Sequence, residues 1–65
     1  MPDKSLRFVL TVGGIERSRH KSLVAAQRRA RNLNASHKTV IQNVYPKKGE
    51  TLSWALLSDG WYSHG

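Results

Sequence analysis

The sequence predicts a small α+β domain in which one helix packs on one face of an antiparallel sheet of three to four strands. Three observations lead to this class. Apolar residues alternate with a period of two near each end of the chain, as in strands, and a segment rich in strong helix formers lies between them. Turn-forming residues divide each strand region into a hairpin, which gives the order ββαββ.

The first hairpin is predicted from a segment, 6–12, in which every second residue is apolar: Leu6, Phe8, Leu10 and Val12. This pattern is typical of a strand with one buried face. Gly13 and Gly14 then favour a two-residue primed turn, because both of its central residues need positive φ. Residues 15–19 are therefore expected to return as a second strand, and the sheet has three strands if they form a loop instead.

The helix is expected over residues 23–33, a run without glycine or proline, with Ser22 as its N-cap. At 100° per residue, one stripe about 80° wide contains four apolar side chains, namely Leu23, Ala26, Ala30 and Leu33. The two alanines are small enough to let the helix pack closely on a sheet.

The second hairpin is predicted from two segments. Residues 39–45 are rich in β-branched and aromatic residues, and residues 51–57 carry Leu52, Trp54 and Leu56 at every second position. In the loop between them, Pro46 suits a turn position with φ near −65°, and Gly49 suits a turn position with positive φ. After a further turn at 58–60, the chain is expected to end in a short polar segment that carries Trp61 and Tyr62.

The composition indicates one small basic domain, 1–65, with eleven Lys and Arg, four Asp and Glu, and a formal net charge of +7. The absence of cysteine excludes disulfides, thiolate metal sites and a cysteine nucleophile, and it fits a reducing cytoplasm. The first residues are polar, and the apolar run 8–10 is far shorter than a signal-peptide core or a membrane span. We therefore expect a cytoplasmic protein that does not insert into a membrane.

No pattern in the sequence predicts an enzyme, a metal site or a cofactor. The acidic residues are few and scattered over the N-terminal segment and predicted turns or strands: Asp3, Glu16, Glu50 and Asp59. A pair of convergent carboxylates is therefore not expected. The three histidines lack the spacing that presents two metal ligands on one helix: His20, His37 and His64. We expect no catalytic residue and no metal ligand.

Basic residues are dense between Arg17 and Arg31, where six cations lie within fifteen residues and Glu16 is the only neighbouring acid. A surface of this charge is typical of proteins that bind phosphates or an acidic protein surface, although a solvated helix face has the same composition. We predict a nucleic-acid-binding module for DNA or RNA. Its candidate phosphate contacts are Arg17, Arg19, Lys21, Arg28, Arg29 and Arg31, assisted by Lys38, Lys47 and Lys48.

The alternative hypothesis is a small protein-binding adaptor or inhibitor, of the kind phages encode, that docks on an acidic partner protein. It would use the basic surface, an exposed sheet edge, or Trp61 and Tyr62 as anchors. A self-associating structural protein, for example a homodimer, is a further hypothesis. The aromatic residues could also stack on single-stranded bases, although Trp54 alternates with leucines and is expected in the core.

The element order resembles that of many short bacterial or phage reading frames, a similarity of architecture that transfers no functional residue.

Overall fold

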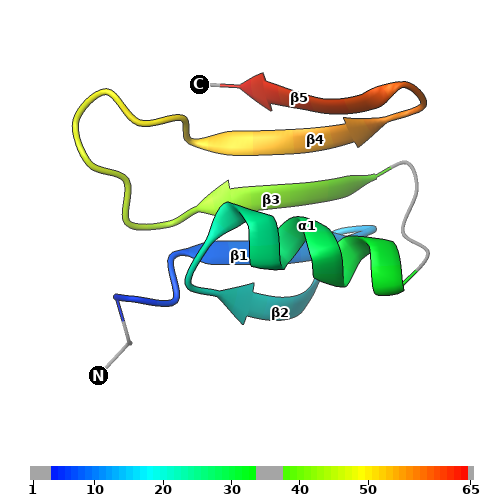
Figure 1. Cartoon of the computed structure of the whole chain (residues 1–65), viewed down its shortest axis with the longest axis horizontal. Coiled ribbons are helices and arrows are strands. Elements are labelled where there is room, and N and C mark those ends of the chain that lie inside the picture. The colour runs from blue at the N-terminus through cyan, green and yellow to red at the C-terminus, as the bar shows by residue number, and fades with distance from the viewer. Residues whose placement is uncertain (1–3, 34–37, 65) are drawn as a thin grey trace.

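The computed structural model describes residues 4–33 and 38–64. One helix lies on one face of a five-stranded antiparallel sheet with the order β2-β1-β3-β4-β5, which confirms the predicted α+β class (Figure 1). The elements are β1 (Phe8–Val12), β2 (Ile15–His20), α1 (Leu23–Asn32), β3 (Thr39–Asn43), β4 (Ser53–Leu57) and β5 (Gly60–His64).

The first hairpin forms as predicted. Gly13 and Gly14 have φ angles of 61° and 84°, and the chain returns as β2 in antiparallel register with β1. Residues 15–19 are therefore a strand, and the three-stranded alternative is wrong. The register shifts within the hairpin and leaves Arg17 as the extra residue of a β-bulge, a feature that increases local twist.

The helix begins where the sequence indicates. Ser22 has extended backbone angles, φ −139° and ψ 155°, and its side-chain oxygen accepts a hydrogen bond of 3.2 Å from the backbone N–H of Ala25. One of the free N–H groups at the helix N-terminus is thereby satisfied. Ala26 and Ala30 are buried against the sheet, as the apolar stripe predicted.

The second hairpin also forms, but its strands are shorter than predicted. Residues 44–52 form the connection between β3 and β4, and Gly49 has the expected positive φ of 87°. The fifth strand, β5, was not predicted, and it follows β4 after a two-residue turn at 58–59. Its sequence, Gly-Trp-Tyr-Ser-His, has no apolar alternation that would predict a strand. The segment is a strand because it pairs with β4.

The core lies between α1 and the two central strands. Leu10 of β1 and Ile41 of β3 are directly opposite each other and fully buried, and they form one cluster with Ala26 and Ala30. Leu23 and Leu33 of the predicted stripe, together with several aromatic residues of the sheet, pack around this cluster: Phe8, Trp54 and Trp61. The two alanines therefore let the helix backbone approach the sheet closely, and this close packing excludes solvent from the centre of the domain.

One buried residue lies on the opposite face of the sheet. The sequence alternation placed Val9 on the exposed face, whereas only 5% of its surface is accessible. Its cross-strand neighbours are Arg19 and Gln42, whose long side chains flank it on both sides. A central strand is screened by its neighbours on both faces, so the expectation of a single buried face is wrong at this position.

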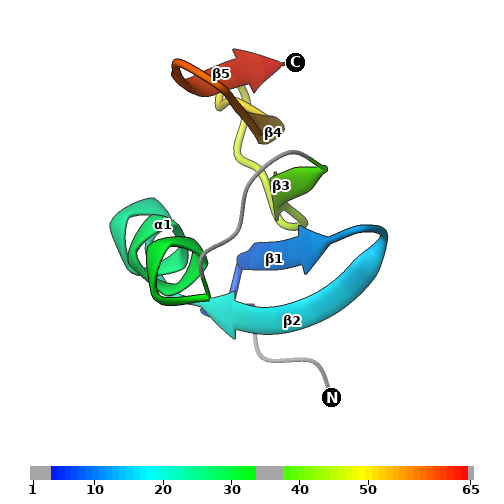
Figure 2. The same ribbon diagram turned by 90° about the vertical axis from the view of Figure 1, so that its right-hand side faces the viewer.

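The helix covers only part of the sheet. It contacts β1, β2 and β3, whereas β4 and β5 extend beyond it on one side. Figure 2 shows this offset, with α1 beside the lower strands and β5 at the far end of the sheet. Among residues 4–33 and 38–64, no helix or strand therefore packs on the helix-bearing face of β4 and β5.

We predict that Ile41→Ala lowers the free energy of unfolding by about 2–5 kcal/mol, because it removes fully buried volume at the centre of the core. A chain of this size holds roughly 3–5 kcal/mol of core-derived stability, so this variant should be largely unfolded. Leu57→Ala is the control, since Leu57 is 51% exposed, and it should change stability by no more than about 0.5 kcal/mol. Urea unfolding followed by circular dichroism measures both. Equal costs would contradict this description of the core.

Candidate functional site

The basic residues of the helix lie on its two flanks. Arg28 and Arg31 are exposed and line a hollow between the helix and β4–β5. Arg29 is exposed on the other flank, near enough to His20 of β2 to disfavour the protonated form of that histidine. Two helix arginines therefore border β4 and β5, and the third lies near the β2 edge.

Three further predicted contacts form a basic arm, residues 17–21, that runs along β2 and into the helix. Arg17 and Arg19 lie on this edge strand, Lys21 lies in the connection to α1, and all three are exposed. Arg19 donates two hydrogen bonds of 3.1 Å to the carboxylate of Glu16, which lowers the pKa of that carboxyl group. One charge of the arm is therefore partly neutralised within the chain, although an exposed pair of this kind is weak.

The three remaining predicted contacts lie apart from the helix. Lys38 precedes β3, whereas Lys47 and Lys48 follow it, so they lie near opposite ends of the sheet. The carbonyl of Lys38 accepts a hydrogen bond of 3.0 Å from the N–H of Gly13 in the first turn. The nine predicted bases thus occupy the helix with its basic arm, the start of β3, and the β3–β4 loop, rather than one continuous group.

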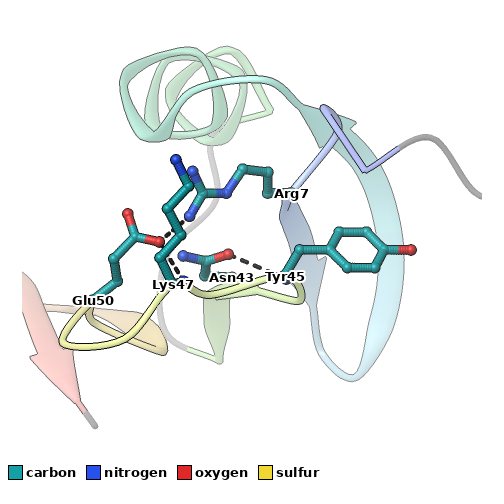
Figure 3. A network of polar contacts seen from close by, with 5 residues as sticks. All are labelled: Arg7, Asn43, Tyr45, Lys47 and Glu50. Atoms are coloured by element: carbon teal, nitrogen blue, oxygen red, sulfur yellow. Dashed lines mark hydrogen bonds and ion pairs between the residues drawn. The ribbon is translucent and has the colours of Figure 1, made fainter.

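An ion pair that the sequence analysis did not identify organises the β3–β4 loop (Figure 3). The Arg7 guanidinium donates to the Glu50 carboxylate, which also accepts a 2.6 Å hydrogen bond from the backbone N–H of Lys47. That backbone hydrogen bond, followed by Arg7, lowers the pKa of Glu50. Within the same loop, the N–H of Tyr45 donates to the side-chain oxygen of Asn43 at 3.3 Å. Arg7 and Glu50 are 43 positions apart, so no local pattern could predict their contact.

The three acidic residues in the described part of the chain are all engaged away from the helix. Glu16 pairs with Arg19, Glu50 pairs with Arg7, and Asp59 accepts a 2.6 Å hydrogen bond from the Tyr62 hydroxyl. Among residues 4–33 and 38–64, no salt bridge therefore joins a carboxylate to the helix arginines: Arg28, Arg29 and Arg31.

The hollow beside the helix has a volume of about 480 Å³, within the range of roughly 300–1,000 Å³ that is typical of ligand sites. We call it the α1–β5 groove. Its lining residues are Val24, Gln27, Arg28, Ala30 and Arg31 from the helix and Leu56, Gly60 and Trp61 from β4 and β5. This groove could not be predicted from the sequence, because it depends on a fifth strand that brings Trp61 beside Arg28 and Arg31.

The two aromatic residues proposed as a joint anchor for a partner protein lie on opposite faces of β5. Trp61 is opposite Leu56 and packs against the core on the helix side. Tyr62 is the next residue in the strand, is opposite Ala55, and is 47% exposed on the helix-free face. Because successive strand residues point to opposite sides, a single partner surface cannot bury both. Trp54 packs in the core as expected, with its ring 5.7 Å from that of Phe8.

A serine and a histidine lie side by side on β2. The Oγ of Ser18 is 2.8 Å from Nε2 of His20, and burial, followed by the charge of Arg29, lowers the pKa of His20. Nucleophilic catalysis also needs a group that orients the histidine, commonly a carboxylate. No carboxylate of the described residues hydrogen-bonds His20, and these residues contain no group of three potential metal ligands.

No protein-family model, curated protein or solved structure matches this chain. In the part of the chain that the structure describes, the helix is too short and too polar to cross a lipid bilayer. The candidate site is therefore defined by its own geometry and charge.

We predict that His20 makes the protein less stable at acidic pH. Its pKa is lower in the folded state than the ordinary value of about 6.5, so the unfolded chain binds more protons as pH falls. The free energy of unfolding should therefore decrease from about pH 7.5 towards the depressed folded-state pKa. Urea unfolding at several pH values should show a smaller decrease for His20→Gln than for the unsubstituted protein. The other histidines are common to both proteins, so identical decreases would exclude a contribution from His20.

Proposed function

We propose that this chain is a non-enzymatic module that binds nucleic acid through the basic helix and the preceding arm. The observation that supports this proposal is the unneutralised charge of Arg28, Arg29 and Arg31. All three are exposed, and no carboxylate of the described residues pairs with them. Their mutual repulsion is relieved when phosphates approach, because each contact also releases counterions condensed on the nucleic acid.

The expected mode of binding is dominated by the phosphate backbone. A net charge of +7 on 65 residues attracts any polyanion and steers it towards the basic surface. Phosphate contacts carry no sequence information, so affinity should fall steeply with salt and depend little on sequence. For such binding, dissociation constants of roughly 10⁻⁴–10⁻⁶ M are typical at physiological salt.

The contributions of the predicted contacts should differ with their position. Arg28 and Arg31 share one helix flank, three residues apart, so one nucleic-acid strand can contact both. The basic arm lies along β2, at the opposite edge of the sheet, where Arg29 is the nearer helix arginine. Lys47 and Lys48 lie in a loop beyond the end of β3, where the Glu50 carboxylate is close to Lys47. Their contribution should therefore be smaller.

We predict that the double variant Arg28→Gln, Arg31→Gln weakens binding to DNA and RNA by at least about tenfold at low salt. The slope of log K against the logarithm of the salt concentration should also become shallower by about one to two. The double variant Lys47→Gln, Lys48→Gln removes the same net charge and should weaken binding much less. Fluorescence polarisation with labelled single-stranded and duplex oligonucleotides measures both effects. Equal losses would indicate that net charge alone matters and would contradict a helix-centred site. A lack of binding even at low salt would refute the proposed function.

The protein-docking alternative has its own structural support. Leu57 is 51% exposed and Tyr62 is 47% exposed, and they are diagonal neighbours on the helix-free face of β4 and β5. Such a surface could contact an acidic partner protein or a second copy of this chain. Tyr62→Ser should leave nucleic-acid affinity unchanged under the proposed function. Concentration-dependent self-association in sedimentation velocity, abolished by Tyr62→Ser, would favour the alternative.

A further inference from the structure

The position of the helix creates a groove that combines an apolar floor with a basic wall. Because α1 contacts β1, β2 and β3, the helix-side residues of β4 and β5 lie beside it and are only partly buried. Leu56 and Trp61, a directly opposed pair on these two strands, line the groove from the sheet. Arg28 and Arg31 line it from the helix, together with the side chain of Gln27.

Trp61 has the properties of a fixed stacking platform. It packs against the core cluster that contains Leu10 and Ile41, and it also lines the groove. Packing on the core restricts its side chain before any ligand binds, which lowers the entropy lost when a flat group stacks on it. Every nucleobase offers such a flat surface, and stacking on aromatic residues beside basic side chains is how many proteins hold single-stranded nucleic acid.

We propose that the α1–β5 groove binds single-stranded nucleic acid, with one base stacked on Trp61 and the adjacent phosphates on Arg28 and Arg31. This inference rests on the proposed function and narrows it to unpaired strands. The bases of a duplex are stacked on one another, so they cannot reach an indole that lies in a groove between helix and sheet. A duplex can contact the two arginines, but it cannot occupy the groove. Gln27 also lines the groove, and its amide has the donor and acceptor groups that would pair with the edge of a stacked base.

The test compares fluorescein-labelled oligothymidylate with a duplex of the same length. Trp61→Leu should weaken binding of the single strand by about 5- to 150-fold, as expected for loss of one stacked base, and should leave duplex binding nearly unchanged. Trp61→Phe should retain most of the affinity because a ring remains. Tyr62→Leu alters the neighbouring residue on the opposite face, so it should have no effect on single-strand binding. Equal affinities of the Trp61→Leu and unsubstituted proteins for oligothymidylate would overturn the proposal.

A second measurement does not depend on the folding of Trp61→Leu. In the Trp54→Phe background Trp61 is the single tryptophan, and oligothymidylate should quench its fluorescence with the same midpoint as the polarisation titration. Quenching by poly-glutamate but not by oligothymidylate would overturn the proposal in favour of an acidic peptide. If both nucleic acids bind through Arg28 and Arg31 without quenching Trp61, the proposed function holds and the groove inference fails. If neither nucleic acid binds at low salt, both fail.

Discussion

The arrangement of this domain depends on the close packing of two helix alanines against the central strands. Ala26 and Ala30 lie on the fully buried pair Leu10 and Ile41, and larger residues at these positions would force the helix away from the sheet. This contact fixes the rotation of α1 about its axis as well as its distance from the sheet. With this rotation, Arg28 and Arg31 line the groove that the helix forms with β4 and β5.

The same contact explains why a groove exists. An α-helix with its side chains is about 10–12 Å wide, whereas neighbouring strands lie about 4.8 Å apart, so one helix covers two to three strands. A sheet of five strands is too wide for it, and the two strands beyond the helix carry the partly buried residues Leu56 and Trp61. Because the short helix leaves two strands of the broad sheet beside it, apolar residues of these strands lie next to helix arginines that pair with no carboxylate of the described residues. No further element is needed to form the groove.

The sequence predicted most of the secondary structure because the local signals were strong. The glycine pair of the first turn, the Ser22 cap and the apolar stripe of the helix all act within a few residues. The fifth strand was missed because its pairing with β4, rather than its own pattern, stabilises it. Helix geometry predicts that Arg28 and Arg31 share one side of the helix without Arg29, but the positions of Lys38, Lys47 and Lys48 at two ends of the sheet could not be predicted from the sequence. Likewise, the separation of Trp61 from Tyr62 onto opposite faces became evident only once both were assigned to a strand.

The central claim is that one flank of the helix and the uncovered strands together form a surface for nucleic acid. The most direct measurement is a titration of the ¹⁵N-labelled protein with oligothymidylate, followed through backbone and indole N–H signals by NMR. The account predicts that signals of Gln27, Arg28, Arg31 and the Trp61 indole shift together, while those of Tyr62 and Lys48 remain in place. Shifts centred on the helix-free face, or spread evenly over all exposed lysines and arginines, would contradict it.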